Sequence, residues 1–322
     1  MRDHNRALLR LGFVTAAQRV DEFEALRPHL LAVGYRLTGT FADAEDAVQD
    51  AWLRWQASSD APDDLRAWLT TVVSRLSLDR LRSAARRRET YVGEWLPEPV
   101  VIEPGVADPL SAVVAHEDAR YAAMVVLERL TPDQRVAFVL HDGFAVPFSE
   151  IASVLGTTDA AARQLASRAR RIVGEHRGPV DSTHDEVVGR FLAAMAAGDI
   201  ETVTVLLHPE VTFTGDSNRK APTAFRAIRG PDKVARFLFG LARRYGPGWV
   251  EASLLALVNG ELGVYTPGAP GHDGHAPIMP RIIAVTVRDG KVYAVWDVAN
   301  PDKFTGSPLA SRPTEPGTRH RN

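Results

Sequence analysis

One face of the segment 159–173 carries polar side chains at helical spacing. They are Arg163, Gln164, Ser167, Arg168 and Arg171. Arginine and glutamine can form bidentate hydrogen bonds with guanine and adenine edges in the major groove, and arginine also neutralises phosphates. The set therefore predicts a helix that reads DNA. Taken alone, the same residues also fit a solvated, arginine-rich helix face.

The elements around this segment have the start and stop signals of a helix-turn-helix. Thr131 can cap a helix that has a proline at its first position. Gly156 can take the left-handed conformation that turns the chain after a second, short helix. Thr157 or Thr158 then caps the third helix, so we expect a helix-turn-helix over residues 130–173. Its expected buried stripe comprises Ala162, Leu165, Ala169 and Ile172.

An earlier amphipathic segment has an acidic outer face. Its apolar face carries Val48, Trp52 and Trp55, and its polar face carries Asp43, Asp46 and Asp50. The acidic face points either to solvent or to a partner. The next helical segment has an apolar stripe and ends in a basic cluster. The stripe comprises Leu69, Val72, Val73, Leu76 and Leu81, and the arginines off it are Arg75, Arg80, Arg82, Arg86, Arg87 and Arg88.

The composition and periodicity of the chain change twice after these helices. Residues 89–109 hold four prolines and two glycines with little periodicity, which indicates a long linker. A second break lies at Gly178 and Pro179. Beyond His184, a helix is followed by alternating segments and by a hairpin signal at Asp289-Gly290, which predicts an α+β domain.

Bulk composition limits the function classes. The 322 residues carry a formal charge of −2 and are 45% hydrophobic, which is typical of a soluble globular protein of two or three domains. The absence of cysteine excludes disulfide frameworks, zinc fingers and thiol catalysis. No apolar run approaches the roughly 20 residues that a spanning helix needs, so we expect a cytoplasmic protein with no membrane contact.

The two helical blocks resemble the extracytoplasmic-function sigma factors of bacterial RNA polymerase, within the sigma-70 family. In that family a first domain binds the polymerase and the −10 promoter element, and a second domain reads the −35 element. LRPHLLAVGYRLTGTFADAEDAVQDAWLRW and RAWLTTVVSRLSLDRLR, within residues 26–88, look like the first domain. Residues 130–173 look like the second, and two ordered matches are far more specific than either alone.

The resemblance implies roles for the polar faces. The acidic helix would dock on the clamp helices of the polymerase through Asp43, Glu45, Asp46, Gln49 and Asp50. The next helix would meet the melted −10 strand through Trp68, Arg75, Arg80 and Arg82. For the tryptophans individually, a place in the core is the stronger alternative. Many members carry an Arg-Asn pair where this chain has Ser74-Arg75, so their −10 preference does not carry over.

The C-terminal block resembles SnoaL-like domains of the NTF2 type, in which a curved sheet and helices enclose a cone-shaped pocket. Sigma factors of group 41 carry such an extension and three signatures. The linker signature is matched by Trp95-Leu96-Pro97-Glu98-Pro99 and the terminal one by Asn300-Pro301-Asp302-Lys303. The third is matched by Asp216-Ser217-Asn218-Arg219-Lys220, which keeps the acid and the lysine but loses the glycines.

These signatures predict an interdomain contact. We expect Trp95 and Leu96, presented by a stiff proline segment, to pack against the extension or the domains it bridges, near Asp216 to Lys220. Burial of two such side chains contributes several kcal/mol at about 25 cal/mol per Å² of apolar surface. The alternative is that Trp95 packs locally against its own domain.

Domains of the NTF2 type host catalysts as well as binding modules, so the fold alone does not decide. The candidate catalytic groups are His208, Asp216 and Asp297, and no HExxH, GxSxG or phosphate-loop pattern occurs. We predict no enzymatic activity, no metal and no cofactor. A small ligand in the C-terminal pocket is left open.

The sequence thus predicts a multidomain chain of two all-α sigma domains, the second with a helix-turn-helix, followed by an α+β NTF2/SnoaL-like cone domain. The expected parts are an arm at 1–20, a region 2 domain at 21–90, a linker at 91–109, a region 4 domain at 110–176, a SnoaL-like domain at 184–304 and a disordered tail at 305–322.

The predicted function is that of a sigma factor that binds core RNA polymerase and promoter DNA, recognises both elements and starts transcription, with its C-terminal domain regulating it in cis. The alternative is a SnoaL-like small-molecule enzyme or ligand sensor fused to a conventional helix-turn-helix regulator. Such a regulator would have no reason to carry the acidic face.

Overall fold

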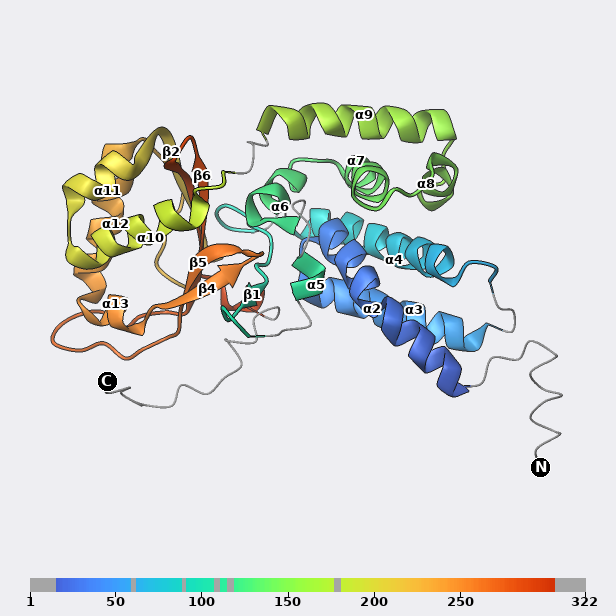
Figure 1. Cartoon of the computed structure of the whole chain (residues 1–322), viewed down its shortest axis with the longest axis horizontal. Coiled ribbons are helices and arrows are strands. Elements are labelled where there is room, and N and C mark those ends of the chain that lie inside the picture. The colour runs from blue at the N-terminus through green and yellow to red at the C-terminus, as the bar shows by residue number, and fades with distance from the viewer. Residues whose placement is uncertain are drawn as a thin grey trace.

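The computed structural model describes residues 16–58, 62–88, 91–106, 111–114, 119–176 and 181–304. A helical half and an α/β half lie side by side, with the linker between them (Figure 1). The predicted tail and most of the predicted N-terminal arm lie outside the described residues, and the first described helix begins at Ala16, within the predicted arm. Among the described helices, none combines the length and the apolar character needed to cross a membrane.

Three helices form the first helical unit: α2 (Ala16–Thr38), α3 (Phe41–Ala57) and α4 (Leu65–Arg88). Thr40 caps α3 by accepting a hydrogen bond from the Asp43 amide. Helices α2 and α3 approach closely at Gly34, where a Cβ atom would lie 3.1 Å from Ala44. A larger residue at this position would push the two helices apart.

The second helical unit contains the predicted helix-turn-helix. Its elements are α5 (Ser111–Val114), α6 (Tyr121–Leu127), α7 (Pro132–Phe138), the π-helical turn η2 (Val139–Gly143), α8 (Phe148–Leu155) and α9 (Asp159–His176). Thr131 and Gln134 form a capping box at α7, and Gly156 has φ of 65° at the turn after α8. Of the two predicted caps of α9, Thr158 accepts the hydrogen bond, from the Ala161 amide.

The buried stripe of α9 differs from the prediction. Its buried positions are Ala162, Ala166, Ala169 and Val173. The predicted Leu165 and Ile172 lie half-buried at the border of the core. The buried positions are separated by four, three and four residues, so they lie along one line on a helix with 3.6 residues per turn. The larger Leu165 and Ile172 lie on either side of that line.

The C-terminal half is an α+β unit built on one seven-stranded sheet, in the order β1-β4-β5-β6-β7-β2-β3. Its helices are α10 (His184–Ala197), α11 (Ile200–Leu206), α12 (Pro231–Tyr245), α13 (Gly248–Ala252) and the 3₁₀ turn η3 (Pro301–Lys303). Its own strands are β2 (Leu207–Asp216), β3 (Ile228–Arg229), β4 (Leu254–Val258), β5 (Glu261–Thr266), β6 (Arg281–Arg288) and β7 (Lys291–Val298). Strands β2 and β7 run parallel, and all other pairs are antiparallel.

The seventh strand of this sheet comes from the linker. Strand β1 (Val101–Ile102) pairs antiparallel with β4, where Val101 lies opposite Val258. Backbone hydrogen bonds therefore join the linker to the C-terminal half. The edge of β4, which would otherwise be unpaired, is thus covered by a segment of the same chain.

The two faces of the sheet contact different parts of the molecule. One face packs under α10, α11 and α12 through residues such as Phe213, Val285 and Val295. The opposite face packs on the linker and α6, where Leu96 and Tyr121 are buried. The sheet is thus the single layer between its own helices and the rest of the chain.

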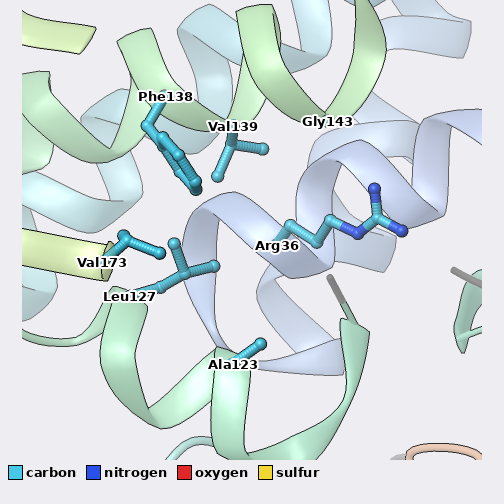
Figure 2. A pocket seen from close by; sticks show the side chains of 7 residues that line it. All are labelled: Arg36, Ala123, Leu127, Phe138, Val139, Gly143 and Val173. Atoms are coloured by element: carbon cyan, nitrogen blue, oxygen red, sulfur yellow. The ribbon is translucent and has the colours of Figure 1, made fainter. Parts of the chain in front are cut away.

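The helical units share one continuous apolar core, although the sequence indicates two separate domains. A small cavity of about 20 Å³ lies at their junction. Figure 2 shows Leu127, Phe138 and Val173 pointing toward one another across it, with Arg36 on the side of α2. The buried Arg135 donates to the Arg36 carbonyl at 2.9 Å and pairs with Glu128 at 2.7 Å, which ties α7 to α2.

Candidate functional sites

The acidic face of α3 borders a hollow of about 290 Å³ between α2 and α3. Glu45, Asp46 and Gln49 are exposed along its rim, and the half-buried Trp52 lines it. The ring of Trp52 packs against that of Phe23, with centroids 4.9 Å apart. The hollow combines apolar side chains such as Phe23 with charged ones such as Glu24 and Arg27, so it can receive a partner that presents both an apolar anchor and polar groups.

Three of the predicted members of this face have partners within the chain, and one of them is Glu45, which lies 3.7 Å from the Arg27 guanidinium in an exposed ion pair. Asp43 accepts a hydrogen bond from the Thr40 hydroxyl at 2.8 Å, and Asp50 pairs with Arg80 at 2.8 Å. The Asp50–Arg80 pair joins a residue predicted to bind polymerase to one predicted to bind DNA. Asp50 and Arg80 therefore hold α3 against α4.

The basic face of α4 meets the second helical unit. Arg75 donates to the Ser153 hydroxyl at 2.9 Å and to its carbonyl at 3.2 Å, and Arg82 pairs with Asp133 at 2.9 Å. Trp68 is half-buried against the helical core, which matches the core alternative for this residue. Arg75 and Arg82 are thus bonded to α8 and α7, and these contacts would compete with a phosphate for the same guanidinium groups.

Helix α9 lies on the outside of the helical half (Figure 1). The residues predicted to read DNA are all exposed: Arg163, Gln164, Ser167, Arg168 and Arg171. The guanidinium of Arg163 lies 5.1 Å from the Phe148 ring centroid, which fixes its stem against α8. The rest of this face is exposed and leaves room for the helix to enter a DNA groove.

The three signature segments named in the sequence analysis converge on a buried cluster around Asp216. The Asp216 carboxylate accepts hydrogen bonds from the Leu96 amide at 2.8 Å and from the Tyr91 hydroxyl. It pairs with Lys303 at 2.5 Å. Asn300 donates to the Tyr91 hydroxyl at 3.1 Å, which closes the cluster. Burial and the adjacent carboxylate raise the pKa of Tyr91, so its hydroxyl stays a donor.

Lys303 also binds the linker directly. Its ammonium donates to the Leu96 carbonyl and lies 3.3 Å from the centroid of the Trp95 ring. Lys220, at the far end of its signature, forms an exposed ion pair with Asp302. The expected contact between Trp95-Leu96 and the Asp216 segment is therefore present, and its centre is Lys303.

The second half of the linker signature faces the first helical unit. The buried Glu98 accepts a hydrogen bond from the Phe41 amide at the start of α3, at 2.7 Å. Tyr35 donates to the Glu98 carbonyl at 2.7 Å, and Tyr121 donates to the Pro97 carbonyl at 2.8 Å. The linker is thus bonded to all three parts of the chain within a few residues. Pro99 continues this buried path toward β1.

Sequence reasoning missed a fully buried asparagine at the same junction. Asn259 Nδ2 donates to the Tyr35 hydroxyl at 2.8 Å and to the Ala119 carbonyl at 2.6 Å, and its Oδ1 accepts from the Val100 amide at 3.0 Å. The side chain reaches both helical units and the linker from the β4–β5 turn. The dipeptide Asn259-Gly260 is a hairpin signal, but its sequence carries no sign of these distant partners.

The candidate catalytic groups do not converge. His208 and Asp216 lie near opposite ends of β2, which puts them roughly 25 Å apart at about 3.3 Å per residue. Asp297 is fully buried in an ion pair with Arg281 at 3.2 Å and accepts from the Thr223 hydroxyl at 2.6 Å. Asp216 and Asp297 lie on neighbouring strands, one register position apart, but their carboxylates are held by different cations. His208 is distant from both, so the three groups do not form one reaction centre.

The architecture defines a class: a helix-turn-helix regulator whose two helical units are docked on a C-terminal α+β domain. Residues 22–87 match the family described as Sigma-70 region 2, and residues 121–173 match Sigma-70, region 4. SigJ of Mycobacterium tuberculosis, an ECF RNA polymerase sigma factor, is 69% identical over 310 residues, which cover 94% of this chain and 99% of SigJ. The chain belongs to the extracytoplasmic-function (ECF) sigma factors, as the sequence predicted.

Two further comparisons agree with this assignment. The crystal structure of M. tuberculosis SigJ matches this chain with a TM-score of 0.81, covering 90% of this chain and 99% of that one. SigI of the same organism, named as a probable ECF RNA polymerase sigma factor, is 36% identical over 218 residues, or 66% of this chain and 73% of SigI. The multidomain layout and the predicted role in promoter recognition and transcription initiation are confirmed, and the fused enzyme is not favoured.

Proposed function

We propose that this chain binds core RNA polymerase through the rim of the α2–α3 hollow and reads promoter DNA through α4 and α9. The exposed arginine and glutamine face of α9 is the observation that carries the DNA part of the proposal. For the polymerase part, Glu45, Asp46 and Gln49 have the exposure that a docking surface requires. Asp50 and Arg80 serve mainly to fix α3 against α4.

The C-terminal domain regulates this activity in cis by holding the helical units in the closed arrangement. Its buried contacts with the linker and the first unit centre on Lys303, Asp216 and Asn259. In this arrangement Arg75 and Arg82 are bonded to the helix-turn-helix unit. We infer that the two units must separate before α4 can meet the −10 strand.

Run-off transcription with bacterial core polymerase tests the initiation role. Promoter fragments are first selected from genomic DNA by the wild-type protein–core complex. Arg171→Ala should lower transcripts about 5- to 150-fold, because one base-reading arginine contributes about 1–3 kcal/mol. Arg190→Ala, on an exposed site of α10, is the matched control and should change nothing.

The polymerase surface is tested in the same assay. Asp46→Lys should weaken the complex with core polymerase while leaving the fold intact, since Asp46 is exposed. Equal transcription from wild type, Arg171→Ala and Asp46→Lys would reject both proposed surfaces. Loss with Asp46→Lys alone would keep the docking surface and reject the α9 assignment.

A further inference from the structure

The C-terminal domain has an apolar cavity, open to solvent on one side, on the face of the sheet opposite the linker. Its volume is about 390 Å³. Helices α10, α12 and α13 form one side, with Phe191, Leu238 and Trp249, and strands β5, β6 and β7 form the other, with Val264, Ile283 and Val295. This cavity is separate from the Asp216 cluster and from the DNA and polymerase surfaces.

The chemistry of the lining selects the occupant. Among its described residues there is no aspartate, glutamate, lysine, arginine or histidine. Its polar side chains are Ser253 and Thr266, whose hydroxyls are bonded to each other at 2.9 Å. A charged ligand would lose its hydration here without gaining a partner, so the cavity favours a neutral molecule with at most one or two hydrogen-bonding groups.

The volume of the cavity points to a small molecule. One turn of an α-helix, about 10 Å wide and 5.4 Å long, occupies roughly 400 Å³ and would fill the whole space. A cavity of this size is within the usual range for small-molecule sites. Water in the cavity finds few hydrogen-bond partners on this apolar lining, so an apolar occupant that displaces it is favourable.

The sheet links the cavity to the linker. Val264, Ile283 and Val295 face the cavity, and their chain neighbours Tyr265, Ile282 and Trp296 belong to the opposite face that packs on the linker. A molecule that changes the positions of these strands therefore acts on the surface that holds Leu96. Only one layer of backbone separates the two.

We propose that this cavity binds a neutral, apolar small molecule and that binding changes how firmly the linker docks. The proposal rests on the cis-regulatory role proposed above and adds the chemical class of its signal. The class includes flat or branched molecules of about 15–25 non-hydrogen atoms, such as neutral aromatic or terpenoid compounds.

A pair of fluorescent probes tests the charge rule on the full chain. N-phenyl-1-naphthylamine is neutral, and 1-anilinonaphthalene-8-sulfonate has the same aromatic skeleton with one added negative charge. We expect saturable, one-to-one binding of the neutral probe and at least tenfold weaker binding of the sulfonate. Equal affinity for both probes, or no binding of the neutral one, would overturn the proposal.

Variants place the probe. Gly189→Phe puts a ring at the cavity wall, where an added Cβ meets no atom within 4 Å, and Ala242→Phe fills the cavity from α12. Both should lower the affinity for the neutral probe at least tenfold. Val205→Lys, at an exposed apolar position of α11 outside the lining, should leave it within twofold. If the lysine variant lowers the affinity and the two phenylalanine variants do not, the probe binds the exposed surface and not the cavity. If sedimentation shows a dimer that does not bind the probe, a second copy of the chain covers the site. Either result rejects the proposal.

A final comparison separates this inference from the proposed function. Run-off transcription and linker proteolysis are measured on wild type and Gly189→Phe, each with and without the neutral probe. In wild type we expect the probe to change both transcription and linker proteolysis at least twofold. In Gly189→Phe we expect it to change neither. Normal transcription with no response to the probe rejects the ligand and leaves the sigma function standing, whereas failure of all transcription rejects the proposed function itself.

Discussion

The Lys303 ammonium lies 2.5 Å from Asp216 Oδ2, in a pair whose side chains are 5% and 0% exposed. Both charges also have neutral partners on the linker, because Asp216 accepts from the Leu96 amide and Lys303 donates to the Leu96 carbonyl. The pair therefore holds the two peptide groups on either side of Leu96, one through its N–H and the other through its C=O. This arrangement converts a flexible connection into a docked one.

Removal of one charge should release the linker. Lys303→Met leaves the Asp216 carboxylate buried without its cation, which costs about 3–5 kcal/mol. We expect a lower urea midpoint and faster proteolysis of the linker. The double variant Asp216→Asn with Lys303→Met should recover much of the loss, since no buried charge remains. Lys220→Met is the control: it breaks an exposed pair worth at most about 1 kcal/mol, and an equal effect from both single variants would contradict the argument.

The sequence predicted the parts of this junction better than their arrangement. The three signatures identified Leu96, Asp216 and Lys303 because each keeps an unusual local pattern. The pairing of β1 with β4 could not be read from them, since a two-residue strand has no detectable period. Nor could the contacts of Arg75 and Arg82 with the second unit, which depend on how two helical units pack and not on local pattern.

The buried Asn259 supports a prediction about hydrogen bonds at the junction. Asn259→Ala removes three of them and places alanine at a φ of 52°. We expect a loss of about 3–4 kcal/mol in the free energy of unfolding. Asn259→Gly removes the same bonds without the strain and should recover about 1 kcal/mol of that loss. Equal stability of wild type and the glycine variant in urea titrations would show that the bonds contribute nothing.

The missing glycines of the third signature have a measurable cost. Asn218 and Arg219 have φ values of 44° and 61°, where asparagine is tolerated and arginine is strained. Arg219→Gly should therefore stabilise the protein by about 0.5–1 kcal/mol, after the added freedom of glycine in the unfolded chain and the loss of the Arg219–Phe225 contact. Ser217→Gly, at a position without positive φ, should be neutral or destabilising. Thermal and urea unfolding of both variants decide this.

Acid should weaken the first helical unit through His29. Burial, then the charges of Arg66 and Arg36, lower the pKa of this side chain to about 4. Its Nδ1 accepts from Arg66 at 3.2 Å, and its Nε2 lies 3.1 Å from the Thr70 hydroxyl, so the neutral ring is the bonded form.

The sign of the pH effect follows from the two states. The unfolded chain takes up the proton near pH 6.5 and the folded chain only near pH 4. The stability contributed by neutral His29 is complete above pH 6.5 and is lost as the pH falls toward 4. We expect a loss of about 1 kcal/mol between pH 7 and 5, after allowance for partial exposure. His29→Gln should remove this part of the pH dependence. The exposed His272→Gln should retain it, and identical profiles of the two variants would contradict the assignment.

The contact between α4 and the helix-turn-helix unit should open when its charge pair is reversed. Asp133→Lys replaces the attraction to Arg82 by repulsion, and a change of 1 kcal/mol shifts the ratio of open to closed molecules about fivefold. Because the chain has no cysteine, Gln56→Cys and Ala160→Cys give two unique sites for fluorescent labels on exposed positions of α3 and α9. We expect lower energy transfer in Asp133→Lys than in the control Asp63→Lys, which makes the same charge change on the exposed loop before α4.

Salt should reduce the difference between these two labelled variants, because the Arg82–Asp133 pair is exposed and is screened within about 10 Å at 0.1 M salt. A single-stranded DNA carrying the melted −10 sequence should lower energy transfer in wild type as well, since its phosphates compete for Arg75 and Arg82. If the DNA binds without any change in transfer, α4 is accessible in the closed arrangement and the two units need not separate. If transfer falls, the arginines of α4 are the point at which DNA binding and closure exclude one another.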